Sequence, residues 1–297
     1  MGCRAVGLVG LVVLAGCGDP RVFIDAAPPG DGRRDDAVVD DPVDAGPVDA
    51  VILDAPPVLT APTSFAAALG ALCGVGYDHV AARVWVYPCN GATVHAFTAA
   101  GAAVGTLPRP GEVANDVDVA FAPAPIVIGA TAVAAGAMLF INGETGVAEV
   151  HLPTTAGAPP LVTRFGDSHV VGGGYHPARR TLFVVQDGVP ATRANTVAEV
   201  DPVTGAVVAM FSTLPGYAVN YGDLEVCPSS GNLFVVSSSE TTIAELTATG
   251  TLVGTYALPA GVVAVSGLAL GPDGAAWLVG TGGQVWRLAG LPCAALP

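Results

Sequence analysis

Lysine is absent from this chain of 297 residues, and all 11 basic side chains are arginines. The absence excludes Schiff-base chemistry, a lysine general base and the phosphate-binding lysine of a P-loop. Acidic residues number 25, so the formal net charge is −14. Because nucleic-acid binding requires clustered basic side chains, this charge also excludes a nucleic acid as the partner.

Charged residues (12%) and aromatic residues (6%) are scarce, whereas hydrophobic residues make up 52% of the chain. The apolar run 126–141 is shorter than the roughly 20 residues that a transmembrane helix requires. It also contains Gly129 and Gly136 and follows Pro125. We therefore expect this run to form buried strands rather than a membrane span.

The first 16 residues have the features of an export signal. Arg4 precedes the short apolar run Val6–Leu14, which leads into Leu14-Ala15-Gly16-Cys17. This ending resembles the bacterial lipobox, in which the signal is removed before the cysteine and lipid is attached to its sulfur. The resemblance implies that Cys17 anchors an exported protein to the membrane, at the periplasmic face or the outer surface of the cell envelope. An ordinary secretory signal with an incidental cysteine is the alternative.

Residues 17–60 differ in composition from the rest of the chain. Positions 18–60 hold ten Asp and seven Pro, with no Glu, Trp or Tyr. Such a segment cannot bury enough apolar surface to offset its chain entropy, and its negative charge favours an extended chain. We predict a disordered linker between the anchor and a folded domain over residues 61–297.

Four cysteines remain once Cys3 is removed with the signal and Cys17 carries lipid. An even number in an exported chain indicates two disulfides, for which three connectivities exist. A predicted hairpin near Ala81 would bring Cys73 opposite Cys89, and this leaves Cys227 to pair with Cys293. A zinc site is the alternative, but no CxxC pair or nearby histidine supports it.

A repeat of about 45 to 50 residues runs through the predicted domain. Each unit has two short strands, a third strand, a Gly-containing turn and a fourth strand. Four prolines that follow the first strand of their units, Pro123, Pro177, Pro228 and Pro272, are 54, 51 and 44 residues apart. Four strands per unit predict an all-β fold, a β-propeller of five blades, with a sixth if the 54-residue unit hides further strands. A strand near residues 64–69 is expected to complete the last blade, and the long repeat disfavours a two-sheet sandwich.

The run Gly267–Gly274, followed by Trp277-Leu278-Val279, resembles the NHL- and YVTN-type propeller repeats. Residues 223–258 are similar to the phytase-like or esterase-like propellers of exported bacterial proteins. The resemblance implies a propeller but is diagnostic of no single activity. Phytase activity is disfavoured because the chain lacks the Lys and Arg cluster that phosphate cleavage requires.

Polar side chains recur before the innermost strands of three units, where propellers bind ligands. Their oxygens would suit Ca²⁺, and in the gluconolactonase-like and phytase-like propellers similar rims hold a divalent metal. Alternatively, these side chains cap turns or satisfy buried backbone groups between blades. The candidates are Asn115, His169 and Asn220, eight residues before their prolines; Asp118 and Asp223, five before; and the adjacent Asp116, Asp167 and Glu225.

No Gly-x-Ser-x-Gly nucleophile motif is present, and the remaining cysteines are assigned to disulfides. We therefore expect a monomeric lipoprotein whose propeller binds a protein, peptide or glycan without catalysis. A Ca²⁺-dependent lactonase- or esterase-like hydrolase, with its site at the propeller mouth, is the alternative.

Overall fold

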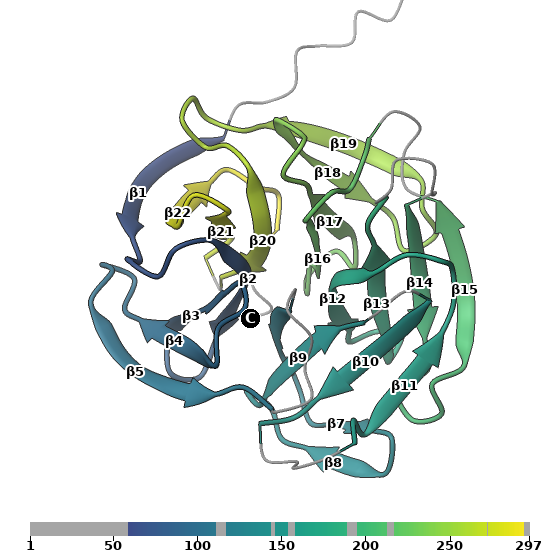
Figure 1. The fold of residues 1–297 in the computed structure, drawn as a ribbon. Coiled ribbons are helices and arrows are strands. Elements are labelled where there is room, and N and C mark those ends of the chain that lie inside the picture. The colour runs from purple at the N-terminus through teal and green to yellow at the C-terminus, as the bar shows by residue number, and fades with distance from the viewer. Residues whose placement is uncertain are drawn as a thin grey trace, which may run out of the picture. The chain divides into compact units, whose positions relative to one another are not determined.

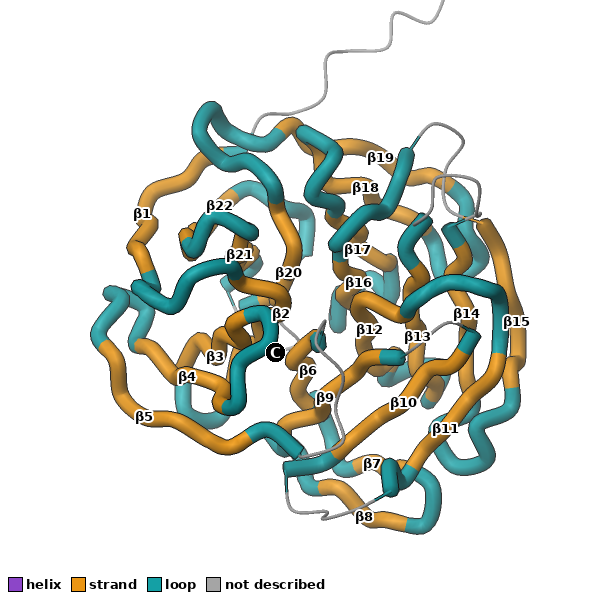
Figure 2. The backbone as a smooth tube through the Cα atoms, in the orientation of Figure 1, coloured by secondary structure: helices purple, strands orange, loops and turns teal. Residues whose placement is uncertain are grey.

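The computed structural model describes residues 59–110, 117–143, 146–153, 158–188, 195–212, 217–271 and 273–293. The predicted signal, Cys17 and the linker up to residue 58 lie outside these residues, as do Asn115 and Asp116. All 22 elements in the described part of the chain are β-strands (Figures 1 and 2). Among the described residues, no helix has the length and hydropathy that a membrane span requires.

Twenty of the strands form five four-stranded antiparallel sheets, which are the blades of a propeller (Figure 1). Blades 1 to 4 follow one another along the chain, and blade 5 combines the two ends of the described domain. The strands of each blade are named from the innermost to the outermost. Blade 1 consists of β2 (Leu72–Asp78), β3 (Arg83–Pro88), β4 (Thr93–Phe97) and β5 (Ala103–Pro108). Blade 2 consists of β6 (Asp118–Phe121), β9 (Met138–Asn142), β10 (Val147–His151) and β11 (Leu161–Arg164). Blade 3 consists of β12 (Val170–His176), β13 (Thr181–Gln186), β14 (Thr196–Val200) and β15 (Val207–Ser212). Blade 4 consists of β16 (Asp223–Val226), β17 (Leu233–Val236), β18 (Thr242–Leu246) and β19 (Leu252–Ala257). Blade 5 consists of β20 (Val265–Leu270), β21 (Ala276–Gly280), β22 (Gln284–Ala289) and β1 (Thr60–Ala66).

The innermost strands meet around one centre. Each of β2, β6, β12, β16 and β20 contacts the next in that order, and β20 contacts β2, so the ring is closed. Strand β1 pairs with β22, which joins the start of the described domain to its last blade. The predicted five-blade propeller and the completing N-terminal strand are therefore confirmed.

Burial follows the position of a strand within its blade. The second strands are mostly apolar and buried, as in Leu233-Phe234-Val235-Val236 of β17, because neighbouring blades cover both faces of the sheet. Outer strands such as β5 and β15 are largely exposed. The core thus consists of Val, Leu and Phe side chains between adjacent blades.

The long second unit contains a two-stranded hairpin and not a sixth blade. Strands β7 (Ile126–Ile128) and β8 (Thr131–Val133) pair with each other, between β6 and β9 in the chain. Ile126, Ile128 and Val133 pack into the core cluster that blades 2 and 3 form together. The apolar run that begins at residue 126 is thus used for this hairpin and for β9.

Both disulfides have the favoured connectivity. Cys73–Cys89 links the start of β2 to the residue after β3. Cys227–Cys293 links blade 4 to the segment that follows β22. The disulfides agree with an exported protein.

Candidate functional site

Two aspartates lie at the centre of the ring, where innermost strands begin. Asp118 is the first residue of β6 and Asp223 is the first residue of β16, and both are 1% exposed. The carboxylate of Asp118 accepts hydrogen bonds from the backbone N–H of Val119 (2.6 Å) and of Gly173 on β12 (3.3 Å). That of Asp223 accepts from Leu224 (2.6 Å) and from Leu268 on β20 (2.8 Å). Each aspartate therefore joins its own blade to the next one.

The carboxyl groups of the two aspartates are close enough that the charge of one affects the titration of the other. Burial raises the pKa of Asp118 to about 7, against the opposing hydrogen bonds from Gly173 and Val119. Burial, followed by the nearby charge of Asp118, raises the pKa of Asp223 well above its ordinary value. A shared proton is the expected state of two carboxyls in a region of low dielectric constant.

Glu225 is the third acidic group at this centre. It lies two residues after Asp223 on β16, and therefore on the same side of the strand. Burial, and then the charge of Asp118, raise the pKa of Glu225 well above its ordinary value. The residue nevertheless remains partly exposed, and no hydrogen bond links its side chain to another described residue. Glu225 is thus a carboxyl group with a raised pKa on a partly exposed residue at the ring centre.

Glycines on the neighbouring blade make the space for these side chains. A Cβ atom at Gly172 of β12 would lie 1.9 Å from Oδ1 of Asp223, and one at Gly174 would lie 3.3 Å from Oε2 of Glu225. In blade 1, a Cβ at Gly74 would lie 2.9 Å from the Cα of Asp118. The sequence prediction missed this pairing of glycines with acidic residues, although both stand at matching positions of the repeat.

The other predicted rim residues do not join the carboxyls in any described contact. Asp167 is exposed, and His169 is half-buried with its carbonyl accepting a hydrogen bond from the N–H of Asp187 (3.0 Å). Asn220 uses its backbone in the turn with Ser237 and Ser238. Its Oδ1 atom is buried without a hydrogen-bond partner among the described residues. The structure thus brings together Asp118, Asp223 and Glu225 out of the predicted set.

The arrangement suits proton transfer better than metal binding. Within the described ranges, no group of three or more His, Cys, Asp or Glu side chains has the geometry to hold a metal ion. Both aspartates already accept backbone hydrogen bonds. The predicted Ca²⁺ site also included Asn115 and Asp116, which are not described, so that site stays a prediction.

Two further buried glutamates belong to the scaffold. Glu199 on β14 accepts hydrogen bonds from the guanidinium of Arg179 (2.7 Å) and from Thr181 (2.7 Å), and the bond from Arg179 lowers its pKa. Glu245 on β18 accepts from Asn232 (2.6 Å) and Tyr256 (2.5 Å). These satisfied groups differ from Glu225, which has no such partner among the described residues.

Comparison with known proteins gives the fold alone. No family model and no curated protein sequence matches the chain. The solved glutaminyl cyclase of Myxococcus xanthus aligns with a TM-score of 0.53 and 15% identity, over 78% of this chain and 96% of that chain. A luciferin-regenerating enzyme aligns with a TM-score of 0.48 and 12% identity, over 81% and 97%, a likeness too low to support an argument.

Proposed function

We propose that the chain is a propeller hydrolase of small esters or lactones, with Glu225 as its proton-transfer group. The observation that carries the proposal is a reachable carboxyl whose pKa is raised by burial and by Asp118. A general acid is most effective when its pKa lies near the working pH, and enzymes reach this by burying a glutamate beside other carboxyls.

The residues at the ring centre have different roles in the proposed reaction. Water adds to the acyl carbon of the ester or lactone, the acyl C–O bond breaks, and Glu225 donates its proton to the leaving oxygen. The resulting carboxylate accepts the proton that the added water loses, so Glu225 ends the cycle protonated. The raised pKa values of Asp118 and Asp223 favour their protonated forms, which reduces the negative charge beside Glu225. Gly172 and Gly174 leave the space in which these groups meet.

The fold likeness is compatible with an enzyme, because a glutaminyl cyclase has a similar fold, but a fold alone does not assign an activity. The absence of lysine limits the chemistry that this chain could share with any such enzyme. Because lysine is absent, carboxyls are the acid–base groups at the ring centre. The hydrolysis of an ester or a lactone requires only proton transfer and a water molecule.

The test is hydrolysis of p-nitrophenyl acetate and δ-valerolactone between pH 5 and pH 9. We expect Glu225→Gln to lower kcat at least a hundredfold, because a general acid contributes about 10²- to 10⁴-fold. Glu149→Gln, which removes a half-buried carboxyl on β10, is the matched control and should keep full activity.

A glutaminyl peptide is included because of the structural likeness. Turnover of this peptide alone, lost in Glu225→Gln, would keep the acid–base role and contradict the ester or lactone assignment. Turnover of no substrate, or full activity of Glu225→Gln, would contradict the enzymatic proposal and favour a binding module for protein, peptide or glycan. EDTA and added Ca²⁺ form a separate arm, in which an unchanged rate is expected.

We further propose that Cys17 anchors the exported propeller to the cell envelope through lipid. The lipobox-like sequence and the two disulfides support this location. Mass spectrometry of the membrane-bound protein should find a diacylglycerol-modified Cys17 at the N-terminus. A Cys17→Ala variant that remains membrane-bound would contradict the anchor.

A further inference from the structure

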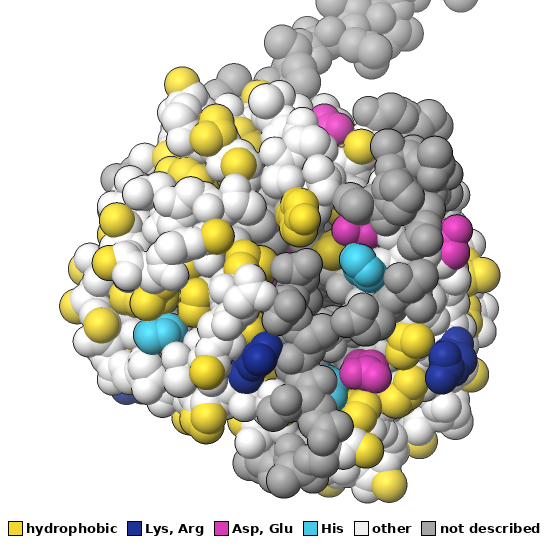
Figure 3. All heavy atoms as spheres, in the orientation of Figure 1, with side chains coloured by type: hydrophobic (Ala, Val, Ile, Leu, Met, Phe, Trp, Pro, Cys, Tyr) yellow, Lys and Arg dark blue, Asp and Glu magenta, His cyan; other side chains and the backbone are white. Residues whose placement is uncertain are grey.

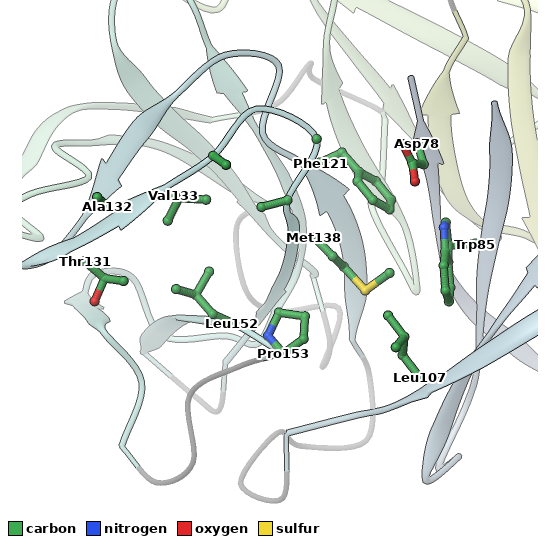
Figure 4. A pocket seen from close by; sticks show the side chains of 13 residues that line it. Asp78, Trp85, Leu107, Phe121, Thr131, Ala132, Val133, Met138, Leu152 and Pro153 are labelled. Carbon is green, nitrogen blue, oxygen red and sulfur yellow. The ribbon is translucent and has the colours of Figure 1, made fainter. Parts of the chain in front are cut away.

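A pocket of about 350 Å³ lies between blades 1 and 2, and none of the residues that line it is Asp118, Asp223 or Glu225 (Figure 4). Blade 1 contributes Asp78, Trp85 and Leu107, and blade 2 contributes Phe121, Met138 and Leu152. The remaining lining residues belong to β8 of the hairpin, to the turn that follows it and to the end of the described segment after β10: Thr131, Ala132, Val133, Ala134, Gly136, Ala137 and Pro153. The pocket thus depends on the hairpin that distinguishes blade 2 from the other blades.

Strand register explains why an acid and two aromatic rings meet at one end of this pocket. Gly76 of β2 is directly opposite Trp85 of β3, and Asp78 lies two residues beyond Gly76 on the same face. A Cβ atom at Gly76 would lie 2.8 Å from the ring of Phe121, so this glycine lets the ring pack against blade 1. Figure 4 shows Asp78, Phe121 and Trp85 together, with Met138, Leu152 and Leu107 beyond them.

Asp78 is the only ionisable side chain among the described residues that line the pocket. Its Oδ1 atom accepts hydrogen bonds from the N–H groups of Val80 (2.9 Å) and Ala81 (2.9 Å), which fixes the carboxylate in place. No salt bridge joins Asp78 to another described residue, including Arg83 opposite it on β3. Arg83 and His79 are neighbours of Asp78, but its carboxylate forms no salt bridge with them and borders an otherwise apolar pocket.

We propose that this pocket binds a small organic ammonium ion with an apolar body. The ammonium group would lie against Asp78 and the faces of Trp85 and Phe121, where carboxylate attraction and cation–π attraction act together. The apolar body would pack on Met138 and Leu152. The net charge of −14 favours the approach of cations and disfavours anions.

This inference is independent of the proposed hydrolase, because no residue of the pocket belongs to the ring centre. Its test is calorimetric titration with three probes of one skeleton: phenethylammonium, 2-phenylethanol and phenylacetate. We expect phenethylammonium to bind about tenfold more tightly than the alcohol, as one charged contact gives, and phenylacetate to bind most weakly. The indole N–H signal of Trp85, identified with Trp85→Phe, should shift on binding of phenethylammonium.

Asp78→Asn keeps the oxygen that caps the turn and removes the charge, so it should abolish the preference for the ammonium probe. Asp201→Asn is the matched control, because Oδ1 of Asp201 also accepts two turn N–H groups, those of Val203 and Thr204, outside the pocket. This variant should bind like the original protein. Ala134→Trp, at an exposed position of the pocket wall, should block all three probes.

Any of three results would overturn the proposal. They are the absence of phenethylammonium binding, an unchanged preference in Asp78→Asn, and full binding in a folded Ala134→Trp protein. Loss of ester hydrolysis in Glu225→Gln with intact ammonium binding would separate the two sites.

Discussion

At the scale of single residues, the centre of the propeller combines a structural role and a chemical role in the same carboxyls. Asp118 and Asp223 hold neighbouring blades through backbone N–H groups of β12 and β20. The alternative that these side chains satisfy buried backbone groups between blades is therefore compatible with their place at the candidate site. Glu225 shares their low-dielectric surroundings without their backbone partners, which makes it the available acid.

The stability of the fold should fall as these groups lose their protons. Because the pKa of Asp118 is raised to about 7 in the folded chain, the folded state binds more protons than the unfolded state. The stabilising contribution is complete below pH 4 and is lost as the pH rises through about 7, with a slope of up to about 1.4 kcal/mol per pH unit.

Asp118→Asn removes this titration and should flatten the dependence of the unfolding free energy on pH. Urea unfolding at pH 5, 6, 7 and 8 measures it, with Asp201→Asn as the control at an exposed turn. An equally steep fall in both variants would contradict the assigned pKa.

Gly172 provides a steric test of the same centre. Gly172→Ala would place its Cβ 1.9 Å from Oδ1 of Asp223 and should destabilise the fold by about 1–3 kcal/mol. Gly105→Ala on the exposed strand β5, where nothing lies within 4 Å, is the matched control and should be neutral or slightly stabilising. Thermal unfolding distinguishes the two variants, and equal melting temperatures would contradict the close approach.

At the scale of elements, the β7–β8 hairpin is both part of the core and a wall of a pocket. Ile128 is fully buried, whereas the neighbouring Val127 is 43% exposed. Truncation to alanine should therefore cost about 2–5 kcal/mol at Ile128, where a cavity forms, and much less at Val127. Denaturant unfolding measures both free energies, and a small effect at Ile128 would show that the hairpin is not packed.

The elements differ in how far the sequence could predict them. The strands of blades 3 and 4 follow an apolar pattern with a shared proline and a Gly-containing turn, so their repeat is visible. The hairpin in blade 2 has no such counterpart, and its apolar residues merge with those of β9. Asp118, Asp223 and Glu225 were predictable because the proline-based alignment places them near one end of the ring.

The pocket and the glycine pairing were not predictable in this way. Both depend on contacts between different blades, such as Gly76 with Phe121 and Gly172 with Asp223. Spacing within one repeat carries no signal for such contacts. Charged side chains are also few and scattered on the face that Figure 3 shows, in agreement with the low charge content of the sequence.

At the scale of the whole molecule, closure of the ring depends on β1 in blade 5 and on a disulfide near the end of the chain. Cys227–Cys293 spans a sequence separation of 66 residues and joins blade 4 to the segment after β22, whereas Cys73–Cys89 spans 16 within blade 1. A cross-link stabilises more when it closes a longer loop.

Replacing both cysteines by alanine should therefore cost about 4 kcal/mol for Cys227–Cys293 and about 3 kcal/mol for Cys73–Cys89. Denaturant unfolding of the two double variants gives the comparison. A larger loss for Cys73–Cys89 would show that the fold does not depend on fixing its C-terminal segment to blade 4.

The central claim is that Glu225 is a protonated, reachable acid at the centre of the ring. Its most direct test is an NMR titration of the Glu225 side-chain carboxyl carbon in the folded protein, with Glu225→Gln used to assign the signal. The account predicts a midpoint well above the ordinary glutamate pKa of about 4.3, lowered in Asp118→Asn because that variant removes a neighbouring negative charge. A midpoint at or below the ordinary value would contradict the account.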